Sequence, residues 1–486
     1  MEPSTKTIYE YLNEKTKNQP LFRDDSGESL TCGQAKAKVD AMAAGLQDLG
    51  ARAGDVLALR FPRTASAALV EFALLTLGAA ALLTDPHATK ETYLAGGDLA
   101  GLDGYLTDET GHWVLIRNDG TERPLTESDR PFAAPKQDAM APAVLISTSG
   151  STGKTKTVVL SQYNIVNNLV DAAAFGDYVP GDLALGILPL FHIFGQVLLF
   201  GSLILDYAIL FPEIVSADAA LRCVETFGVT RMNGVPSLYK AMGEKAGDYD
   251  VSTLRVGFIG GSPCTVREIR DIEAKLGMKL LNAYGMSECV SISISNAADP
   301  LEKRIGGVGH IYPLSRVKIL GPDGRKVEPG EQGEITVQGA SRMLGYFRDP
   351  EATRAAIDAD GFLHTGDLGY LDGDGILHIT GRIKEIIIRN GVNLSARRIE
   401  EALLSVPGVS AAAVVGIPDA KQGEVPAAMA VSDRTEAELM ADLAEKLPKN
   451  EIPVRIWLTE SIPLTPSGKP DKQTIQKFLQ KAKKSR

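Results

Sequence analysis

The sequence predicts an α/β protein, with a large N-terminal domain of mainly parallel sheets covered by helices plus a β-rich subdomain, and a small, mobile α+β C-terminal domain. Three observations support this fold class. The chain has 486 residues, which is too long for one ordinary hydrophobic core. Short apolar runs alternate with amphipathic helical segments before Ile319, as is typical of parallel sheets. From Ile319 onward, short β-rich runs between turn residues replace this alternation.

The alternating elements follow in order along the N-terminal region. Apolar residues at helical spacing predict a helix over 32–49, an apolar run predicts a strand over 55–61, and a second helix is expected over 66–77. The further elements expected by the same criteria are strands at 143–146, 183–188 and 254–259 and helices at 195–207 and 266–276. Because ligands bind beyond the carboxyl ends of parallel strands, we expect a site in the loops that follow these strands.

The C-terminal region has a different pattern. Turn signals such as Pro322-Asp323-Gly324 separate short strands up to Arg382. Beyond Arg382 the expected elements are a helix capped by Ser395, a strand at 410–416, a helix at 436–447, a strand at 454–458 and a helix from Asp471. The sequence therefore predicts a domain of residues 1–382 and a small domain of residues 383–486.

Composition excludes several classes of function. The net charge of −10 argues against nucleic acid as a partner, because phosphate neutralisation needs a basic surface. The four cysteines form no C-x-x-C pair, which argues against a zinc site and fits reduced thiols. No secretory signal is apparent, and the apolar segments 72–83 and 197–211 are too short to span a bilayer. We therefore expect a cytoplasmic protein with no stable membrane span.

A loop of hydroxyl residues, glycines and cations follows the predicted strand 143–146. Glycine permits close backbone approach, hydroxyls donate hydrogen bonds and lysine adds a mobile positive charge, which together suit a polyphosphate. The loop contains Thr148, Ser149, Gly150, Ser151, Thr152, Gly153 and Lys154. It is not a Walker A loop, because Thr148 stands where that motif needs glycine. A penicillin-recognising S-x-x-K site is disfavoured because S-D-N and K-T-G are both missing, whereas a plain solvated loop stays open on these residues alone.

The motifs downstream of this loop carry a family resemblance. They are Leu190-Phe191-His192-Ile193-Phe194-Gly195, Asn282-Ala283-Tyr284-Gly285-Met286-Ser287-Glu288, His364-Thr365-Gly366-Asp367, Gly381-Arg382-Ile383-Lys384-Glu385 and Pro463-Leu464-Thr465-Pro466-Ser467-Gly468-Lys469. In this order and spacing they resemble the adenylate-forming (ANL) superfamily, in its acyl- and aryl-CoA synthetase branch. Each motif alone is weak, but these five and the hydroxyl loop together span most of the chain.

The resemblance implies an acid–thiol ligase that uses ATP, Mg²⁺ and CoA. A carboxylic acid would be converted to an acyl-adenylate with release of pyrophosphate, and the acyl group would then pass to the thiol of CoA with release of AMP. A separate acyl carrier protein as the acceptor, or a non-catalytic sensor of ATP and acyl groups, are the alternatives. The residues do not choose between aliphatic and aromatic acids.

The resemblance also assigns roles to residues of the adenylation reaction. It implies contact of the hydroxyl loop with the β- and γ-phosphates, of Glu288 with Mg²⁺ and of Ser287 with the α-phosphate. The residues that the resemblance assigns to the adenine and its surroundings are Gly261, Ser262, Asn282, Ala283, Tyr284 and Gly285. Asp367 and Arg382 would bind the ribose, and Lys469 would bridge the carboxylate and the α-phosphate.

Other residues are assigned to the acid, the thiol and the domain motion. The expected substrate pocket contains Phe194, Asn233, Gly260, Met286 and Val290. His192 stands where amino-acid-activating relatives place an aspartate, which argues against an amino acid as the substrate. Asn390 and Gly391 would line the thiol tunnel, and Lys384 would be the hinge of the rotating small domain. The chain departs from the family at Thr155-Lys156-Thr157, where Pro-Lys-Gly is usual, and at Ala396 and Arg398.

Overall fold

The computed structural model describes residues 2–87, 102–108, 112–148, 156–464 and 470–484, and the elements and sheets given below are those of these residues. The chain forms two compact units. The first contains Met1–Val317 and Val337–Leu363, and the second contains Lys318–Thr336 and His364–Arg486. The four-stranded sheet thus groups mainly with the C-terminal residues, so the second unit begins earlier than the predicted domain boundary after Arg382. That functional boundary stays a prediction.

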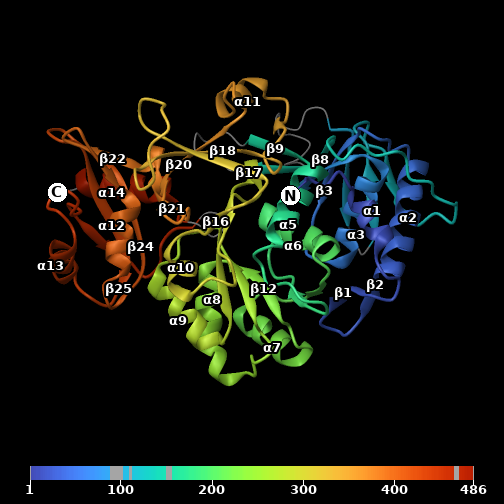
Figure 1. The fold of residues 1–486 in the computed structure, drawn as a ribbon, viewed down its shortest axis with the longest axis horizontal. Coiled ribbons are helices and arrows are strands. Elements are labelled where there is room, and N and C mark those ends of the chain that lie inside the picture. Colours follow the sequence, from blue (N-terminus) through green and yellow to red (C-terminus); the bar gives the residue numbers. More distant parts are fainter. Residues whose placement is uncertain (1, 88–101, 109–111, 149–155, 465–469, 485–486) are drawn as a thin grey trace. The chain divides into compact units, whose positions relative to one another are not determined.

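The first unit contains an eight-stranded sheet with the order β19-β9-β8-β4-β3-β5-β6-β7. Figure 1 labels its strands β3, β8 and β9. Its strands are β3 (Val56–Arg60), β4 (Ala80–Thr84), β5 (Gly104–Asp108), β6 (Trp113–Ile116), β7 (Glu122–Pro124), β8 (Pro142–Thr148), β9 (Lys156–Ser161) and β19 (Gly345–Tyr346). The four central strands β3, β4, β5 and β8 are parallel, as the alternation predicts. The remaining strands add antiparallel edges.

A nine-stranded sheet with the order β16-β15-β14-β13-β12-β10-β11-β1-β2 forms the other half of this unit. Its strands are β1 (Pro20–Asp24), β2 (Ser29–Thr31), β10 (Leu183–Leu185), β11 (Ala208–Phe211), β12 (Arg231–Gly234), β13 (Val256–Ile259), β14 (Lys279–Tyr284), β15 (Ser293–Ile294) and β16 (His310–Ile311). Strands β14, β13, β12, β10, β11 and β1 are all parallel, so their carboxyl ends meet at one edge. That edge is the expected location of a ligand.

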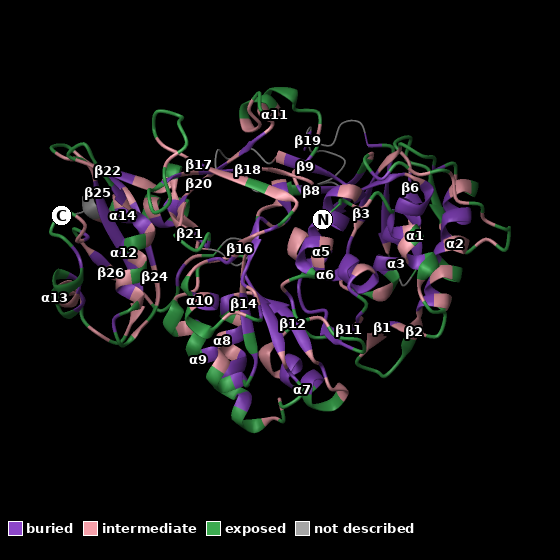
Figure 2. Cartoon of the chain, in the orientation of Figure 1, coloured by how far each residue is buried: buried purple, intermediate pink, exposed green. Residues whose placement is uncertain are grey.

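Helices cover the sheets in the way that their apolar faces require. The helices of this unit are α1 (Ile8–Glu14), α2 (Cys32–Asp48), α3 (Ala65–Leu77), α5 (Gln162–Ala172), α6 (Ile193–Ile204), α7 (Ala217–Phe227), α8 (Pro236–Lys245), α9 (Val266–Leu276), α10 (Leu301–Gly306) and α11 (Pro350–Ala356). The inner faces of α7, α8 and α9 bury side chains with the nine-stranded sheet, and Figure 2 shows α8 and α9 with exposed outer faces. Helix α5 contacts β8 and β9, α6 contacts β11, and the two helices touch each other, so they lie between the sheets.

The second unit has two sheets. A four-stranded sheet has the order β17-β18-β20-β21 and is formed by β17 (Ser315–Leu320), β18 (Gly333–Gly339), β20 (Leu363–Leu371) and β21 (Leu377–Arg382). A five-stranded sheet is formed by β22 (Ile386–Arg389), β23 (Val392–Ser395), β24 (Val409–Asp419), β25 (Gly423–Ser432) and β26 (Ile456–Leu458). Helices α12 (Ala396–Leu404) and α13 (Glu436–Lys446) pack on one face of this sheet and α14 (Lys472–Lys484) on the other.

The predicted fold class is confirmed, and the elements lie close to their predicted bounds. The predicted helix 266–276 is α9 (Val266–Leu276), and the helix expected over 32–49 is α2 (Cys32–Asp48). The Ser395 hydroxyl caps α12 by accepting from the backbone N–H of Arg398, as predicted. No helix within the described part of the chain has the length and apolar character that crossing a membrane requires.

Candidate active site

The carboxyl edge of the nine-stranded sheet brings several predicted ligand residues together. Gly234 pairs with Ile259 of the next strand, and Ile259 pairs with Asn282 of the strand beyond. The predicted pocket residue Asn233 is buried beside this edge on β12. Gly260 follows β13 directly, and its N–H donates to the Gly234 carbonyl at 3.3 Å. The structure therefore places the residues predicted to contact the substrate and adenine, on or directly after β12, β13 and β14, at one edge of the sheet.

Gly260 and Gly261 form the turn that follows β13. Gly261 has φ +83°, which favours glycine. A Cβ on Gly260 would lie 3.0 Å from the Ala283 carbonyl oxygen, so a side chain there would press against β14. Ser262 follows as a partly buried residue. The close approach of this backbone to the predicted adenine segment depends on the glycine.

The loop after β14 is tightly folded around Gly285. A Cβ on Gly285 would lie 2.2 Å from the Val290 carbonyl oxygen, so this position accepts glycine only. Val290 has φ +56° and ψ −84°, a strained backbone for a β-branched residue. The Ile292 N–H donates to the Tyr284 carbonyl at 2.8 Å and closes the loop. Met286, Ser287 and Glu288 lie on this loop with partly buried side chains, at the place where the sequence predicts the α-phosphate and metal ligands.

Glu288 is held by two contacts from one segment. The Tyr346 hydroxyl donates to Glu288 Oε1 at 3.0 Å, and the Met343 N–H donates to the Glu288 carbonyl at 2.8 Å. Burial and the neighbouring Glu288 carboxylate raise the pKa of Tyr346 above its ordinary value, so the phenol stays protonated and donates. The ammonium of Lys156 lies 4.7 Å from the centroid of the Tyr346 ring.

The ends of the predicted phosphate loop are paired. Thr148 lies opposite Lys156 in the antiparallel pair β8–β9, and the Thr148 hydroxyl donates to the Lys156 carbonyl at 3.1 Å. The two strands therefore form a hairpin whose connection begins after Thr148. The predicted phosphate ligands Ser149, Gly150, Ser151, Thr152, Gly153 and Lys154 lie outside the described residues.

His192 and Phe194 stand at the start of α6. His192 is the N-cap residue of the helix, and its ring centroid lies 4.4 Å from that of Phe191. Phe194, in the first turn, packs against the same apolar cluster as Ala283 of β14. The predicted pocket residue Phe194 and the predicted adenine residue Ala283 are thus placed around one cluster.

A buried carboxyl group, that of Glu71, lies against Gln196 of α6. Gln196 Nε2 donates to Glu71 Oε2 at 3.2 Å and to the Leu190 carbonyl at 2.8 Å. The Oε1 atoms of both side chains are buried and have no hydrogen-bond partner among the residues that the structure describes. Complete burial raises the pKa of Glu71 to about 8, so the carboxyl group is neutral at pH 7 and has a proton to donate. Our sequence reasoning missed Glu71, although a single carboxylate within the apolar helix α3 is a visible signal.

The second unit carries the predicted ribose ligands. Asp367 of β20 lies opposite Arg382 of β21, and Arg382 Nε lies 2.7 Å from Asp367 Oδ1. The Asp367 side chain is 4% exposed and that of Arg382 is 42% exposed, so the guanidinium is the accessible partner. The Asp367 N–H donates to the Thr365 hydroxyl oxygen at 3.1 Å. The two predicted ribose residues are therefore brought together by strand pairing.

The predicted thiol and hinge residues lie at two turns of this unit. Asn390 and Gly391 connect β22 and β23 with φ values of +51° and +78°, which is the geometry of a two-residue hairpin turn. Lys384 lies exposed in the short 3₁₀ turn Ile383–Glu385 between β21 and β22. Lys469 lies outside the described residues, and the flanking residues Leu464 and Pro470 pair in an isolated bridge. The roles assigned to these residues in the thiol tunnel, the hinge and adenylation stay predictions.

The Glu288 carboxylate fits a Mg²⁺ ion that is bound together with a nucleotide. The described residues contain no group of three or more His, Cys, Asp and Glu side chains that could hold a metal ion by themselves. Mg²⁺ is commonly held by one or two carboxylates, substrate phosphates and water rather than by an all-protein cage. Glu288, which Tyr346 links to the strand β9 that follows the predicted phosphate loop, matches that pattern.

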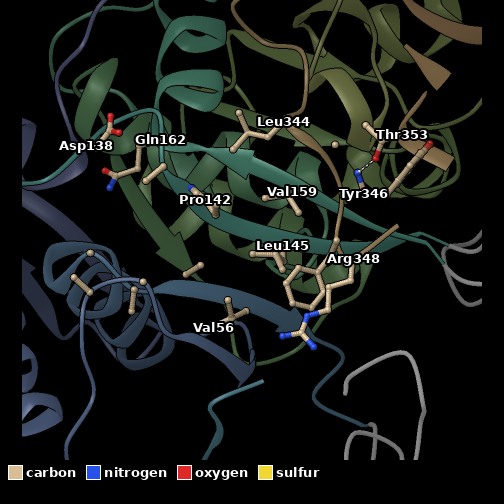
Figure 3. A pocket seen from close by; sticks show the side chains of 18 of the residues that line it. Val56, Asp138, Pro142, Leu145, Val159, Gln162, Leu344, Tyr346, Arg348 and Thr353 are labelled. Atoms are coloured by element: carbon tan, nitrogen blue, oxygen red, sulfur yellow. Dashed lines mark hydrogen bonds between the residues drawn. The ribbon is translucent and has the colours of Figure 1, made fainter. Parts of the chain in front are cut away.

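A cavity of about 830 Å³ lies elsewhere in the first unit. Figure 3 shows Val56, Leu145 and Val159 of the eight-stranded sheet on one side and the segment containing Tyr346 and Thr353 on another. None of the predicted site residues that the structure describes lines it. The segment 344–354 is thus shared between this cavity and the contact with Glu288.

Comparison with known proteins gives a consistent result. The family model described as AMP-binding enzyme matches residues 10–347, and the model described as AMP-binding enzyme C-terminal domain matches residues 398–469. The sulfoacetate–CoA ligase of Cupriavidus necator is 31% identical over 474 residues, covering 92% of both chains. The feruloyl-CoA synthase of an Amycolatopsis species is 32% identical over 476 residues, covering 91% of this chain and 92% of the relative. The solved o-succinylbenzoate CoA synthetase of Bacillus subtilis, in complex with its acyl-adenylate intermediate, is 26% identical with a TM-score of 0.85, covering 98% of this chain and 99% of that chain.

Proposed function

The chain belongs to the AMP-binding enzyme family as an AMP-forming acid–CoA ligase, and we propose which residues carry each step of its reaction. A carboxylate is a poor electrophile because oxide would have to leave. Joining it to AMP gives an acyl-adenylate with a stabilised phosphate leaving group, which the thiol of CoA displaces. The enzyme must align the acid with the α-phosphate and stabilise the negative charge that develops.

The observation that carries the assignment is the contact around Glu288. One segment joins this carboxylate to β9, the strand that leaves the predicted phosphate loop. Glu288 would hold Mg²⁺, which would neutralise charge on the phosphate oxygens when bound. The hydroxyl loop from Thr148 to Lys154 would hold the β- and γ-phosphates, and Ser287 would contact the α-phosphate.

The nucleoside would be held by backbone and by a carboxylate. Gly260 lets the main chain approach β14 closely and Gly261 forms the turn that follows, which suits a flat wall against adenine, with Tyr284 on the other face. Asp367 would accept hydrogen bonds from the ribose hydroxyls. Arg382, already 2.7 Å from Asp367, would fix that carboxylate and add a donor.

The acid would lie at the carboxyl edge of the nine-stranded sheet. Phe194, Asn233, Gly260, Met286 and Val290 are the proposed pocket residues, with His192 near the carboxylate. The relatives are named for sulfoacetate and ferulate, which are respectively a small anionic acid and an aromatic acid. CoA is the proposed acceptor, with Asn390 and Gly391 on its path, and a carrier protein is the alternative acceptor.

We place the reaction in the cytoplasm. None of the four cysteines forms a disulfide in the described part of the chain, and three of them, Cys32, Cys223 and Cys289, are buried. Reduced cysteines persist in a reducing compartment. ATP and CoA are also consumed there.

Carboxylate-dependent pyrophosphate exchange tests the assignment. We expect exchange with one class of acid from a panel that includes sulfoacetate, ferulate, 2-succinylbenzoate and linear fatty acids, followed by thiol consumption when CoA is added.

Glu288→Gln should lower exchange by about 10²–10³-fold, because it removes a charge that acts on the transferring phosphoryl group. Glu351→Gln, on the exposed side of α11, is the control and should keep the wild-type rate. Equal rates for both variants would refute the role of Glu288.

Lys384→Pro tests the proposed hinge. Proline fixes φ near −65° and removes the N–H, so the backbone at this exposed turn should be restricted to one of its two conformations. We expect the rates of adenylation and thioester formation to separate by about tenfold or more, because hinge substitutions alter steps that need domain motion. Stopped-flow measurement of each half-reaction checks this. Unchanged rates in both half-reactions, with a wild-type melting temperature, would move the pivot elsewhere.

A further inference from the structure

We infer that Tyr346 is a positioning residue for adenylation, which holds the Glu288 carboxylate in the orientation that binds Mg²⁺. The inference rests on the proposed function, in which Glu288 is the metal ligand. Tyr346 lies 58 residues from Glu288 in sequence and belongs to none of the motifs that carry the family resemblance. Its position follows only from the fold.

The hydroxyl contact has the geometry of an orienting hydrogen bond. The Tyr346 hydroxyl donates to Glu288 Oε1 at 3.0 Å. A bond to one carboxylate oxygen fixes the plane of the carboxylate and directs the second oxygen, Oε2, toward a ligand. Partners of metal-binding carboxylates act in this way, and removing them typically weakens metal binding by about 10–100-fold.

The backbone of Tyr346 is itself rigidly placed. Tyr346 pairs with Val158 in the antiparallel pair β19–β9. On either side of it, the Leu344 N–H donates to the Val159 carbonyl at 2.9 Å and the Phe347 N–H donates to the Thr157 carbonyl at 2.7 Å. The Tyr346 N–H donates to the Thr353 hydroxyl oxygen at 2.9 Å, a contact drawn in Figure 3. A positioning group needs such support, because a loosely held donor cannot fix its partner.

The segment 343–346 makes two hydrogen bonds to Glu288. Besides the Tyr346 hydroxyl, the Met343 N–H donates to the Glu288 carbonyl at 2.8 Å, so both the side chain and the main chain of Glu288 are hydrogen-bonded to this segment. Packing alone would require only the aromatic ring of Tyr346. The directed hydroxyl is the feature that packing does not explain.

The ring has a second partner on the phosphate side. The Lys156 ammonium lies 4.7 Å from its centroid, within the range of a cation–π contact. Lys156 is the first described residue after the predicted phosphate loop. Tyr346 thus joins the carboxylate proposed for the metal to the strand that carries the phosphate loop, with one function for its hydroxyl and another for its ring.

Substitution by phenylalanine separates the two functions, because it keeps the ring and removes the donor. We expect Tyr346→Phe to weaken Mn²⁺ binding to the enzyme–ATP complex about tenfold, measured by electron paramagnetic resonance with Mn²⁺ as the probe for the Mg²⁺ site. The melting temperature should stay close to that of the wild type. Tyr9→Phe is the matched control, since the Tyr9 hydroxyl donates to Asp40 Oδ1 at 2.8 Å away from the site, and its Mn²⁺ affinity should not change.

Two further variants make every outcome decisive. In a Glu288→Gln background, Tyr346→Phe should cause no additional loss of Mn²⁺ affinity, because its effect passes through that carboxylate. Wild-type affinity in Tyr346→Phe together with lost affinity in Glu288→Gln would overturn the inference and leave the proposed function intact. Wild-type affinity in Glu288→Gln would instead overturn the proposed metal ligand. Tyr346→Leu should also lower the melting temperature, and a Phe variant equally unstable would assign Tyr346 to packing and refute the inference.

Discussion

Lys469→Ala should lower carboxylate-dependent pyrophosphate exchange by about 10²–10³-fold or more, the loss expected when one preorganised group that stabilises developing charge is removed. Thioester formation from a supplied acyl-adenylate should survive, because the bond between the acid and the α-phosphate is then already made. Exchange of labelled pyrophosphate measures the first step, and release of AMP with CoA present measures the second.

The residues around Lys469 provide the control for this experiment. Leu464 and Pro470 pair in an isolated bridge, and the Asp471 N–H donates to the Pro463 carbonyl at 2.8 Å, so the described residues on the two sides of 465–469 hold each other. Substitution of Lys469 should therefore leave the second unit folded. Lys477→Ala, on the exposed side of α14, removes a positive charge eight positions further along the chain and should keep both rates. Equal loss of both half-reactions in Lys469→Ala would contradict the proposed division of roles.

Local sequence signals predicted the elements that build the site but not the contacts between distant segments. Helix α9 has its predicted bounds because Thr265 and Glu268 form a capping box, Gly277 ends the helix, and the apolar spacing is helical. The family resemblance, and not a local signal, assigned Asp367 and Arg382 to one ligand, and the pairing of β20 with β21 brings the two side chains together. The short strand β19 could not be predicted, because two residues carry no periodicity and the pairing of Tyr346 with Val158 depends on tertiary packing.

The domain boundary shows the same limitation. The change of pattern at Ile319 correctly indicated a β-rich region, but the sequence does not say to which unit that sheet attaches. The boundary between the two units runs through both strands: through β17 after Val317 and through β18 before Val337. Burial is likewise a tertiary property. Glu71 is fully buried, and its hydrogen-bond partner Gln196 lies 125 residues away in the chain.

Glu71 should make the protein less stable as the pH rises from about 4.5 to about 8. Its native pKa of about 8 lies above the ordinary value of 4.5, so in this range the folded state keeps a proton that the unfolded state has released. The free energy of unfolding should therefore fall by about 1.4 kcal/mol per pH unit, or roughly 5 kcal/mol over the whole range. Below pH 4.5 both states are protonated and the contribution of Glu71 is fully present, whereas above pH 8 both are ionised and it is lost.

Glu71→Gln isolates this effect, because glutamine keeps the shape and the hydrogen bonds of the neutral carboxyl group but does not titrate. The melting temperature of the variant relative to the wild type should rise steadily between pH 5 and pH 8 and then level off. Asp171, whose pKa burial raises to about 6, contributes a decline of the same sign to both proteins, and that decline cancels in the difference. Glu351→Gln, on exposed helix α11, should follow the wild type at every pH. A difference between Glu71→Gln and wild type that stayed constant with pH would mean that Glu71 is ionised in the native protein. The buried Oε1 atoms of Glu71 and Gln196, which have no hydrogen-bond partner among the described residues, would then require another explanation.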